Sequence, residues 1–205
     1  VLKTAGLSKR ICKEVIFDDV SLSFPKGRVT AITGQNGAGK TTLAQILCGL
    51  ARQTRGHILI DGKKARAAVR RGEIYYCGND TSTQFFAASV AEELLLNTRS
   101  TEESKSRAKN LLKELGLYEY RDAHPSTLSG GQKQRLAIAC AAFSGRGILI
   151  LDEPTSGLDG QNMRLIAERL KSEARNGRTI LVITHDRELI ESCCDNIVEV
   201  EKRSS

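Results

Sequence analysis

One short glycine-rich loop constrains this chain more than any other feature of its sequence. Its eight residues match the pattern G-x-x-x-x-G-K-[ST]; they are Gly34, Gln35, Asn36, Gly37, Ala38, Gly39, Lys40 and Thr41. The apolar run Val29–Thr33 before the loop is typical of a buried strand, and residues 40–50 after it are typical of a helix. This strand–loop–helix context predicts a phosphate-binding loop on an α/β fold.

The residue types in this loop suit a triphosphate. Glycines let backbone N–H groups turn inward around phosphate oxygens, and the following helix directs its positive end at the same anion. We expect Lys40 to neutralise the β- and γ-phosphates, the Thr41 hydroxyl to bind Mg²⁺ and Thr42 to reach the α-phosphate. A tight turn without a ligand is the alternative, but the preceding apolar strand argues against it.

Two carboxylates follow a second apolar run, residues 148–151. In open parallel sheets the carboxyl ends of the strands form the edge where ligands bind. Asp152 suits a role near Mg²⁺, and Glu153 is placed to polarise a water that attacks the γ-phosphate. Alone, this pair could be an ordinary strand end; beside a phosphate-binding loop it predicts catalysis.

Strand-like and helix-like runs alternate along the chain, which predicts a mostly parallel sheet covered on both faces. Residues 79–126 lack strand signals and are expected to form a helical subdomain inserted into the α/β core. Further strands are expected at residues 57–60, 74–77, 148–151 and 179–184, and further helices at residues 102–115, 161–176 and 187–194.

Composition restricts the class of protein further. The 205 residues are 40% hydrophobic and 27% charged, which is sufficient for one well-buried core. The six cysteines have no metal-ligand spacing and are expected to be free thiols. No long uncharged apolar run is present, so we do not expect this chain to span a bilayer.

The net charge of +7 is densest in a cluster of five basic residues. A solvated basic face explains this cluster more simply than nucleic acid, because only 4% of the residues are aromatic and base-stacking platforms are scarce. The cluster consists of Lys63, Lys64, Arg66, Arg70 and Arg71.

Three further motifs identify a family resemblance. Residues 128–135, Leu-Ser-Gly-Gly-Gln-Lys-Gln-Arg, resemble the signature motif of ABC ATPases; residues 156–159, Ser-Gly-Leu-Asp, resemble their D-loop, and His185 resembles their switch histidine. The resemblance implies one ABC ATPase domain over residues 1–205. Its P-loop NTPase core would comprise residues 1–78 and 144–205, with an N-terminal antiparallel β portion, and its helical signature subdomain residues 79–143.

The resemblance also implies a mechanism that needs two cassettes. In the family, two cassettes meet head to tail and enclose two ATP molecules. Ser129, Gly130, Gly131 and Gln132 would then contact the nucleotide bound by the partner, Asp159 would lie at the same interface, and His185 would contact the γ-phosphate. As an alternative, Ser129 could be only a helix N-cap, which would leave the two glycines unexplained.

Two positions depart from the family pattern. Where the family has a glutamine that contacts Mg²⁺ and the attacking water, this chain has Asn79, with Gln84 as a rival five positions later. Where the family stacks an aromatic ring on adenine, this chain has Ile11, so we expect looser base selectivity. The shorter amide of Asn79 predicts slower hydrolysis or altered coupling.

Residues 84–93 resemble the corresponding stretch of cobalt- and vitamin-type importers of the energy-coupling-factor group. In such systems this surface receives a helix of the membrane subunit, although Phe85 and Phe86 could equally belong to the subdomain core. The end of the chain soon after His185 suggests either half of a tandem chain or a minimal cassette.

The resemblance therefore implies an ATP- and Mg²⁺-dependent ATPase that drives transport. Its partners would be a second cassette, in a homodimer, heterodimer or tandem chain, and an integral membrane subunit that holds it at the cytoplasmic face of the cell membrane. One alternative is a soluble ABC ATPase acting on the ribosome or nucleic acid, disfavoured by the lack of a long charged linker. Another is a low-turnover regulatory cassette, against which Glu153 and His185 argue.

Overall fold

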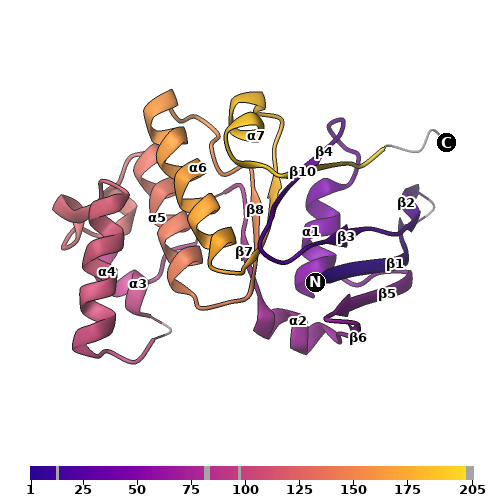
Figure 1. The fold of residues 1–205 in the computed structure, drawn as a ribbon, viewed down its shortest axis with the longest axis horizontal. Coiled ribbons are helices and arrows are strands. Elements are labelled where there is room, and N and C mark those ends of the chain that lie inside the picture. Colours follow the sequence, from indigo (N-terminus) through magenta and orange to yellow (C-terminus); the bar gives the residue numbers. More distant parts are fainter. Residues whose placement is uncertain (13, 81–83, 97, 202–205) are drawn as a thin grey trace.

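A parallel sheet, an antiparallel sheet and a group of helices make up the structure (Figure 1). The structure is a computed structural model that describes residues 1–12, 14–80, 84–96 and 98–201. Within these residues both sheets have five strands, and the parallel one lies at the centre. This arrangement confirms the predicted α/β fold with an antiparallel N-terminal portion.

The central sheet carries the strands that lead to the candidate site. Its parallel strands are ordered β10 (Asn196–Glu199), β4 (Val29–Thr33), β9 (Thr179–Ile183), β8 (Ile148–Asp152) and β7 (Ile74–Cys77). Every residue of β8 and β9 is buried. Such continuous burial explains why these strands read as unbroken apolar runs rather than alternating ones.

Helices cover both faces of this sheet. Helix α1 (Lys40–Cys48) lies on one face, and α5 (Gly130–Phe143), α6 (Gly160–Arg175) and α7 (Arg187–Cys193) lie on the other (Figure 1). The helix expected over residues 40–50 ends two residues early, because Gly49 adopts φ 77° and caps it in the left-handed conformation.

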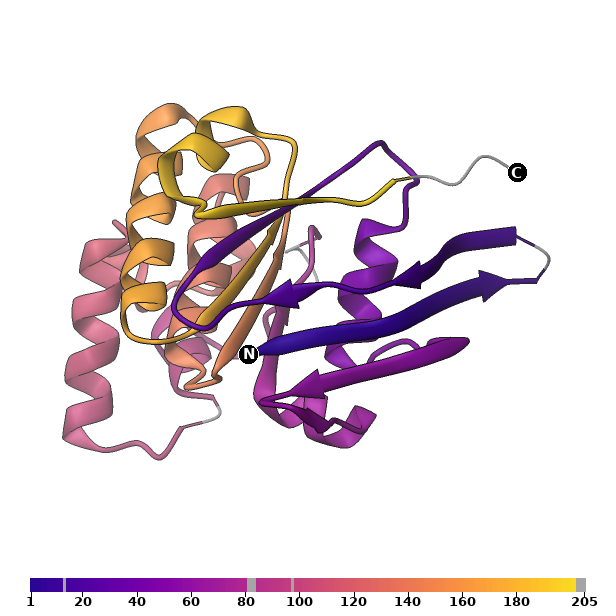
Figure 2. The same cartoon turned by 45° about the vertical axis from the view of Figure 1, so that its right-hand side comes forward.

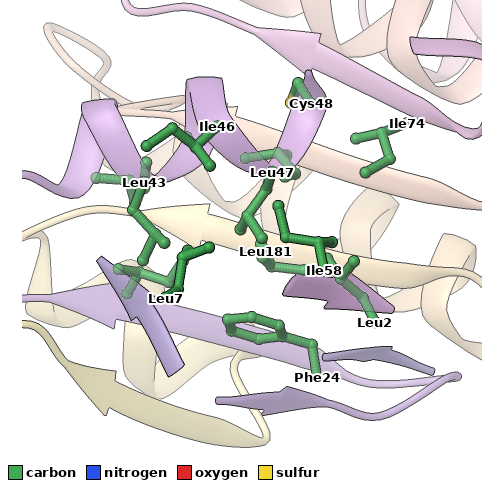
Figure 3. Close-up of a cluster of buried hydrophobic side chains, with 14 of the residues drawn as sticks. Leu2, Leu7, Phe24, Leu43, Ile46, Leu47, Cys48, Ile58, Ile74 and Leu181 are labelled. Carbon is green, nitrogen blue, oxygen red and sulfur yellow. The ribbon is translucent and has the colours of Figure 1, made fainter. Parts of the chain in front are cut away.

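The antiparallel sheet packs against the outer side of α1. It contains β1 (Leu2–Ile11), β2 (Glu14–Val20), β3 (Ser23–Phe24), β5 (Arg55–Ile60) and β6 (Lys63–Lys64), with β1 and β5 side by side in Figure 2. Helix α2 (Ala67–Glu73) follows β6 and leads into β7. The buried core between α1 and the two sheets appears in Figure 3, where Leu7, Leu43, Leu47 and Leu181 are labelled.

The remaining helices form a unit with its own core. They are α3 (Val90–Leu95), α4 (Glu102–Glu114) and two 3₁₀ turns (Tyr118–Tyr120 and Pro125–Thr127), and they share this core with α5. Buried Leu112, Leu117, Leu136 and Phe143 pack together between them. None of the helices in the described ranges has the length and apolar character needed to cross a membrane.

Candidate functional site

The glycine-rich loop joins β4 to α1 in a conformation that side chains would obstruct. Gly34 has φ 137°, and a Cβ there would lie 2.2 Å from the carbonyl oxygen of Val200. Gly39 has φ 90°, and a Cβ there would lie 2.5 Å from Cγ2 of Ile16. Packing and backbone conformation therefore both require glycine at these two positions.

The start of α1 is free to bind an anion. Its N-cap is Gly39, so no side chain caps the first turn, and no acidic side chain lies there. The Lys40 ammonium group donates hydrogen bonds to the backbone oxygens of Gly34, at 2.7 Å, and Gln35, at 3.0 Å. Unpaired N–H groups, the helix dipole and this cation together form a phosphate cradle.

Asp152 lies directly beside this cradle. The Thr41 hydroxyl donates to its Oδ2 at 2.8 Å, and the Tyr76 hydroxyl donates to the same oxygen at 3.3 Å. Only 2% of Asp152 is exposed, and this burial raises the pKa of its carboxyl group, against the lowering effect of the two hydrogen bonds. A hydroxyl and a carboxylate at this spacing are oxygen ligands of the kind that Mg²⁺ prefers.

Glu153 occupies a strained position at the end of β8. Its φ of 50° lies in the left-handed region, which is uncommon for residues other than glycine and clusters at functional sites. Three hydrogen bonds hold this backbone: the Glu153 N–H donates to Ile183 O at 2.8 Å, and Glu153 O accepts from Gln134 Nε2 at 2.9 Å and from Ser156 N at 3.2 Å. The carboxylate contacts His185 Nδ1 at 2.9 Å and accepts from the Thr184 hydroxyl at 3.3 Å.

A cavity of about 440 Å³ unites these groups. Asn79 lines it, whereas the amide of Gln84 turns back to the strand end, where Nε2 donates to Gly78 O at 3.2 Å. Of the two rivals, Asn79 therefore lies beside the phosphate cradle. The complete lining is Ile16, Asn36, Gly37, Gly39, Lys40, Thr41, Thr42, Asn79, Asp152, Glu153 and Ile183.

Ile11 does not reach this lining. It ends β1 with half of its surface exposed, and the neighbouring strand β2 instead supplies Ile16 to the cavity. The proposed contact of Ile11 with a base stays a prediction.

The signature turn lies outside the cavity of its own chain. Ser129 and Gln132 form a capping box at the start of α5: Ser129 Oγ accepts from Gln132 N at 3.3 Å, and Gln132 Oε1 accepts from Ser129 N at 2.8 Å. A Cβ at Gly130 would meet no atom within 4 Å. Capping thus accounts for Ser129 and Gln132, but packing within this chain does not account for Gly130.

Asp159 begins α6 in a similar way. Its carboxylate accepts from the backbone N–H of Asn162 at 2.8 Å, and hydrogen bonding from that N–H is the main reason that its pKa is lowered. This N-cap keeps Asp159 ionised at an exposed helix start, close in sequence to the strained Glu153.

Several side chains at the site escaped the sequence analysis. Tyr76, Gln134 and Thr184 each hold Asp152 or Glu153, and Ile16 packs under Gly39. For Tyr76 a signal existed, since side chains alternate between the faces of β7. For Gln134 the sequence held no such signal, because its contact with Glu153 O joins α5 to the end of β8.

His124 has a structural role. It caps a 3₁₀ turn through Nδ1, which accepts from Ser126 N at 3.2 Å. The sulfur atoms of Cys193 and Cys194 lie 4.0 Å apart, and all six cysteines are free thiols, as predicted. In the part of the chain that the structure describes, no group of His, Cys, Asp and Glu residues could hold a metal ion by itself.

The fold and the site define a P-loop cassette with a phosphate cradle at the start of α1. Comparison with known sequences identifies the family: residues 17–156 match the pattern of the ABC transporter family. The chain belongs to this family, whose function is ATP hydrolysis.

Relatives found by sequence similarity carry names of the same family. An ABC transporter ATP-binding protein of Treponema denticola is 42% identical over 183 residues, which cover 89% of this chain and 37% of the relative. The methionine import ATP-binding protein MetN 1 of Yersinia pestis is 38% identical over 194 residues, 90% of this chain and 57% of the relative. The chain thus spans little more than a third of the first relative and just over half of the second.

Solved structures match over the whole chain. CbiO1 from Clostridium perfringens, part of the ABC transporter complex cbiONQ, has a TM-score of 0.85 at 31% identity and is covered over 87% of its length. The cassette MJ0796, a dimer in a post-hydrolysis state bound to ADP and Pi, has a TM-score of 0.85 at 26% identity and is covered over 97% of its length.

Proposed function

We propose that this chain is the ATP-hydrolysing cassette of an ABC transporter and that it works in a head-to-tail pair with a second cassette. The observation that carries the proposal is the separation of two anion-binding features. The phosphate cradle lies beside Asp152 and Glu153, whereas the signature turn at the start of α5 lies outside that cavity. A second cassette supplies the nucleotide that Ser129, Gly130, Gly131 and Gln132 would contact.

Each residue of the site has a distinct role in this proposal. Lys40 exchanges its two backbone acceptors for phosphate oxygens, and Thr42 contacts the α-phosphate. Thr41, Asp152 and Asn79 would hold Mg²⁺, which when bound would neutralise charge on the phosphates. This assignment fits the 2.8 Å contact between Thr41 and Asp152, which places two suitable oxygens at one point.

Glu153 acts on the attacking water. Its carboxylate faces the cradle and is held by Thr184 and His185, so it can orient the water and accept its proton. In this proposal His185, which contacts Glu153, moves to the γ-phosphate when ATP is bound. The left-handed backbone of Glu153 supports this role, because strained residues cluster at functional sites, where the surrounding structure holds them in place.

A membrane subunit is the second proposed partner. Phe85 packs into the core, but Phe86 is 81% exposed, so the two aromatic residues divide between the two roles considered for them. We assign Phe86 to the contact with the membrane subunit of an energy-coupling-factor-type importer, at the cytoplasmic face of the membrane. The likeness to CbiO1 of the cbiONQ complex supports this assignment.

A single charge tests the paired mechanism. Gly130→Asp places a carboxylate where the partner's γ-phosphate would lie, and the open space at Gly130 lets the variant fold. We expect ATP binding by the separate cassette to remain while ATP hydrolysis falls to background. Gly147→Asp is the matched control, because Gly147 is also exposed and a Cβ there would meet no atom within 4 Å.

Hydrolysis by Gly130→Asp at the rate of the control would refute the paired mechanism. Loss of ATP binding in every variant, with the fold intact by circular dichroism, would refute the role of this chain as an ATPase.

A further inference from the structure

A second and larger cavity lies at the opposite end of α1 from the phosphate cradle. Its volume is about 850 Å³, and its walls come from the loop of residues 49–54, strands β5 and β6, and the start of α2. The nine residues of α1 separate it from Lys40 by about 13 Å, at the usual rise of a helix. It is therefore a separate site from the nucleotide cavity.

The lining of this cavity is strongly basic. Five lysine and arginine side chains line it, and none of the lining residues, all of them within the described ranges, is acidic. Nor does any ion pair in the described part of the chain join one of these five to a carboxylate. The basic residues are Arg52, Arg55, Lys64, Arg66 and Arg70.

Arg70 is the least expected member of this group. The sequence predicted a solvated basic face here, but only 4% of Arg70 is exposed. Its Nη1 donates to Ala65 O at 2.9 Å, while its buried Nε has no partner. A buried guanidinium without a carboxylate and with a free donor is costly unless an anion approaches it.

Lys64 extends the positive charge across the cavity. Its Nζ lies 3.2 Å from Nε2 of His57, so its partner here is an imidazole ring rather than a carboxylate. Arg52, Arg55 and Arg66 stand exposed around the same cavity. An entering anion would meet charges from three separate segments of the chain.

Hydrogen bonds to backbone oxygens hold the walls of the cavity in place. Thr54 N donates to Ser8 O at 2.8 Å, and Arg71 Nη1 donates to Gly49 O at 3.0 Å. Gly49 is confined further, because a Cβ there would lie 2.7 Å from Ala67 O. The cavity is therefore a preorganised feature, which is what tight binding of a small anion requires.

We propose that this cavity binds a phosphate-bearing anion, with Arg70 and Lys64 as its principal ligands. Guanidinium and ammonium groups without acidic neighbours are suited to phosphate oxygens. The anion can be free in solution or be the headgroup of a membrane lipid. Leu50, an exposed residue of the lining, and exposed Val69, next to Arg70 in the sequence, would favour the lipid source.

Strand β6 provides a matched pair of variants. Lys63 and Lys64 are adjacent, exposed and equally charged, but only Lys64 lines the cavity. With ADP present in excess to occupy the phosphate cradle, pyrophosphate is titrated calorimetrically into the wild type, Lys64→Gln and Lys63→Gln. Arg70→Met is added as a second variant, with its fold checked by circular dichroism.

We expect Lys64→Gln to weaken pyrophosphate binding about tenfold, as loss of a charged hydrogen bond does, and Lys63→Gln to change it less than about twofold. Flotation with phosphatidylglycerol vesicles, against phosphatidylcholine vesicles, tests the lipid source with the same variants. A Lys64-dependent signal with pyrophosphate supports a free anion, and one with anionic vesicles alone supports a headgroup.

Equal weakening by Lys63→Gln and Lys64→Gln in both assays would mean unspecific charge attraction and would overturn the proposal. Binding of a short duplex RNA without binding of pyrophosphate or anionic vesicles would overturn it as well.

Discussion

Nδ1 of His185 lies 2.9 Å from Oε1 of Glu153, although the two residues are 32 positions apart. They meet because parallel neighbours β8 and β9 end at the same edge of the sheet; Glu153 directly follows β8, and His185 is the second residue after β9. The backbone hydrogen bond from Glu153 N to Ile183 O fixes their relative height. The carboxylate and the imidazole are therefore positioned as a unit beside the phosphate cradle.

Glu153→Gln should abolish most of the ATP turnover without loss of ATP binding. The amide keeps the shape and can still contact His185, but it cannot accept a proton from water. We expect the rate of phosphate release to fall by about 10²–10⁴-fold, the usual contribution of a general base. Glu188→Gln is the control, because its carboxylate is exposed and its contact with Arg164 is long, at 3.9 Å.

The same variant should accumulate an ATP-bound dimer, measured by analytical ultracentrifugation. A Glu153→Gln protein that hydrolyses ATP at the wild-type rate would exclude Glu153 as the base.

Asp152→Asn should stabilise the fold while removing Mg²⁺-dependent ATPase activity. Burial raises the pKa of Asp152 above its unfolded value of about 3.9, so the ionised carboxylate opposes folding at neutral pH. We expect the free energy of unfolding at pH 7 to rise by about 0.5–2 kcal/mol, as is common when a functional carboxylate is neutralised. Urea titration measures it.

The sign of this effect predicts its pH dependence. Below the unfolded pKa both states hold the protonated acid, so the advantage of Asp152→Asn should disappear; it should grow as pH rises through the folded pKa and then level off. If the gain in the free energy of unfolding of Asp152→Asn were the same at pH 3 and pH 7, it would arise from packing and not from the ionisation of Asp152.

Asn79→Gln should raise the ATPase rate of the assembled complex. Asn79 lines the nucleotide cavity with a side chain one methylene shorter than the glutamine of the family pattern, so the longer amide should reach the Mg²⁺ and water more closely. Asn79→Ala should lower the rate by comparison. Steady-state phosphate release measures both, and an unchanged rate for Asn79→Gln would exclude any limit set by side-chain length.

Nucleotide base selectivity should be weak. Ile11 is half exposed and has no ring to stack on a base, and the cavity lining from β2 is the aliphatic Ile16. We expect ATP and GTP to bind with affinities within about tenfold of each other, since the missing stacking contact is worth about 1–3 kcal/mol. Ile11→Tyr should tighten ATP binding in fluorescence titrations. A strong preference of the wild type for ATP would contradict this account.

The sequence by itself determined the residue types of the candidate site. The loop of residues 34–41, the Asp152-Glu153 pair and the signature residues are contiguous motifs, and their spacing from neighbouring apolar runs placed them at strand and helix ends. The α/β class followed from the same alternation. Such features are predictable because a local backbone requirement and a local residue choice coincide.

Only the tertiary structure decided which side chains meet. It brought Tyr76 and Thr41 to one oxygen of Asp152, turned Gln84 away while Asn79 lined the cavity, and buried Arg70 where the sequence indicated a solvated face. These outcomes depend on strand order, register and the packing of α1 and α2, which join residues far apart in the chain. A run of charged residues or an amide has the same sequence pattern whether its side chains are buried or exposed. Only the packed fold determines which of the two applies.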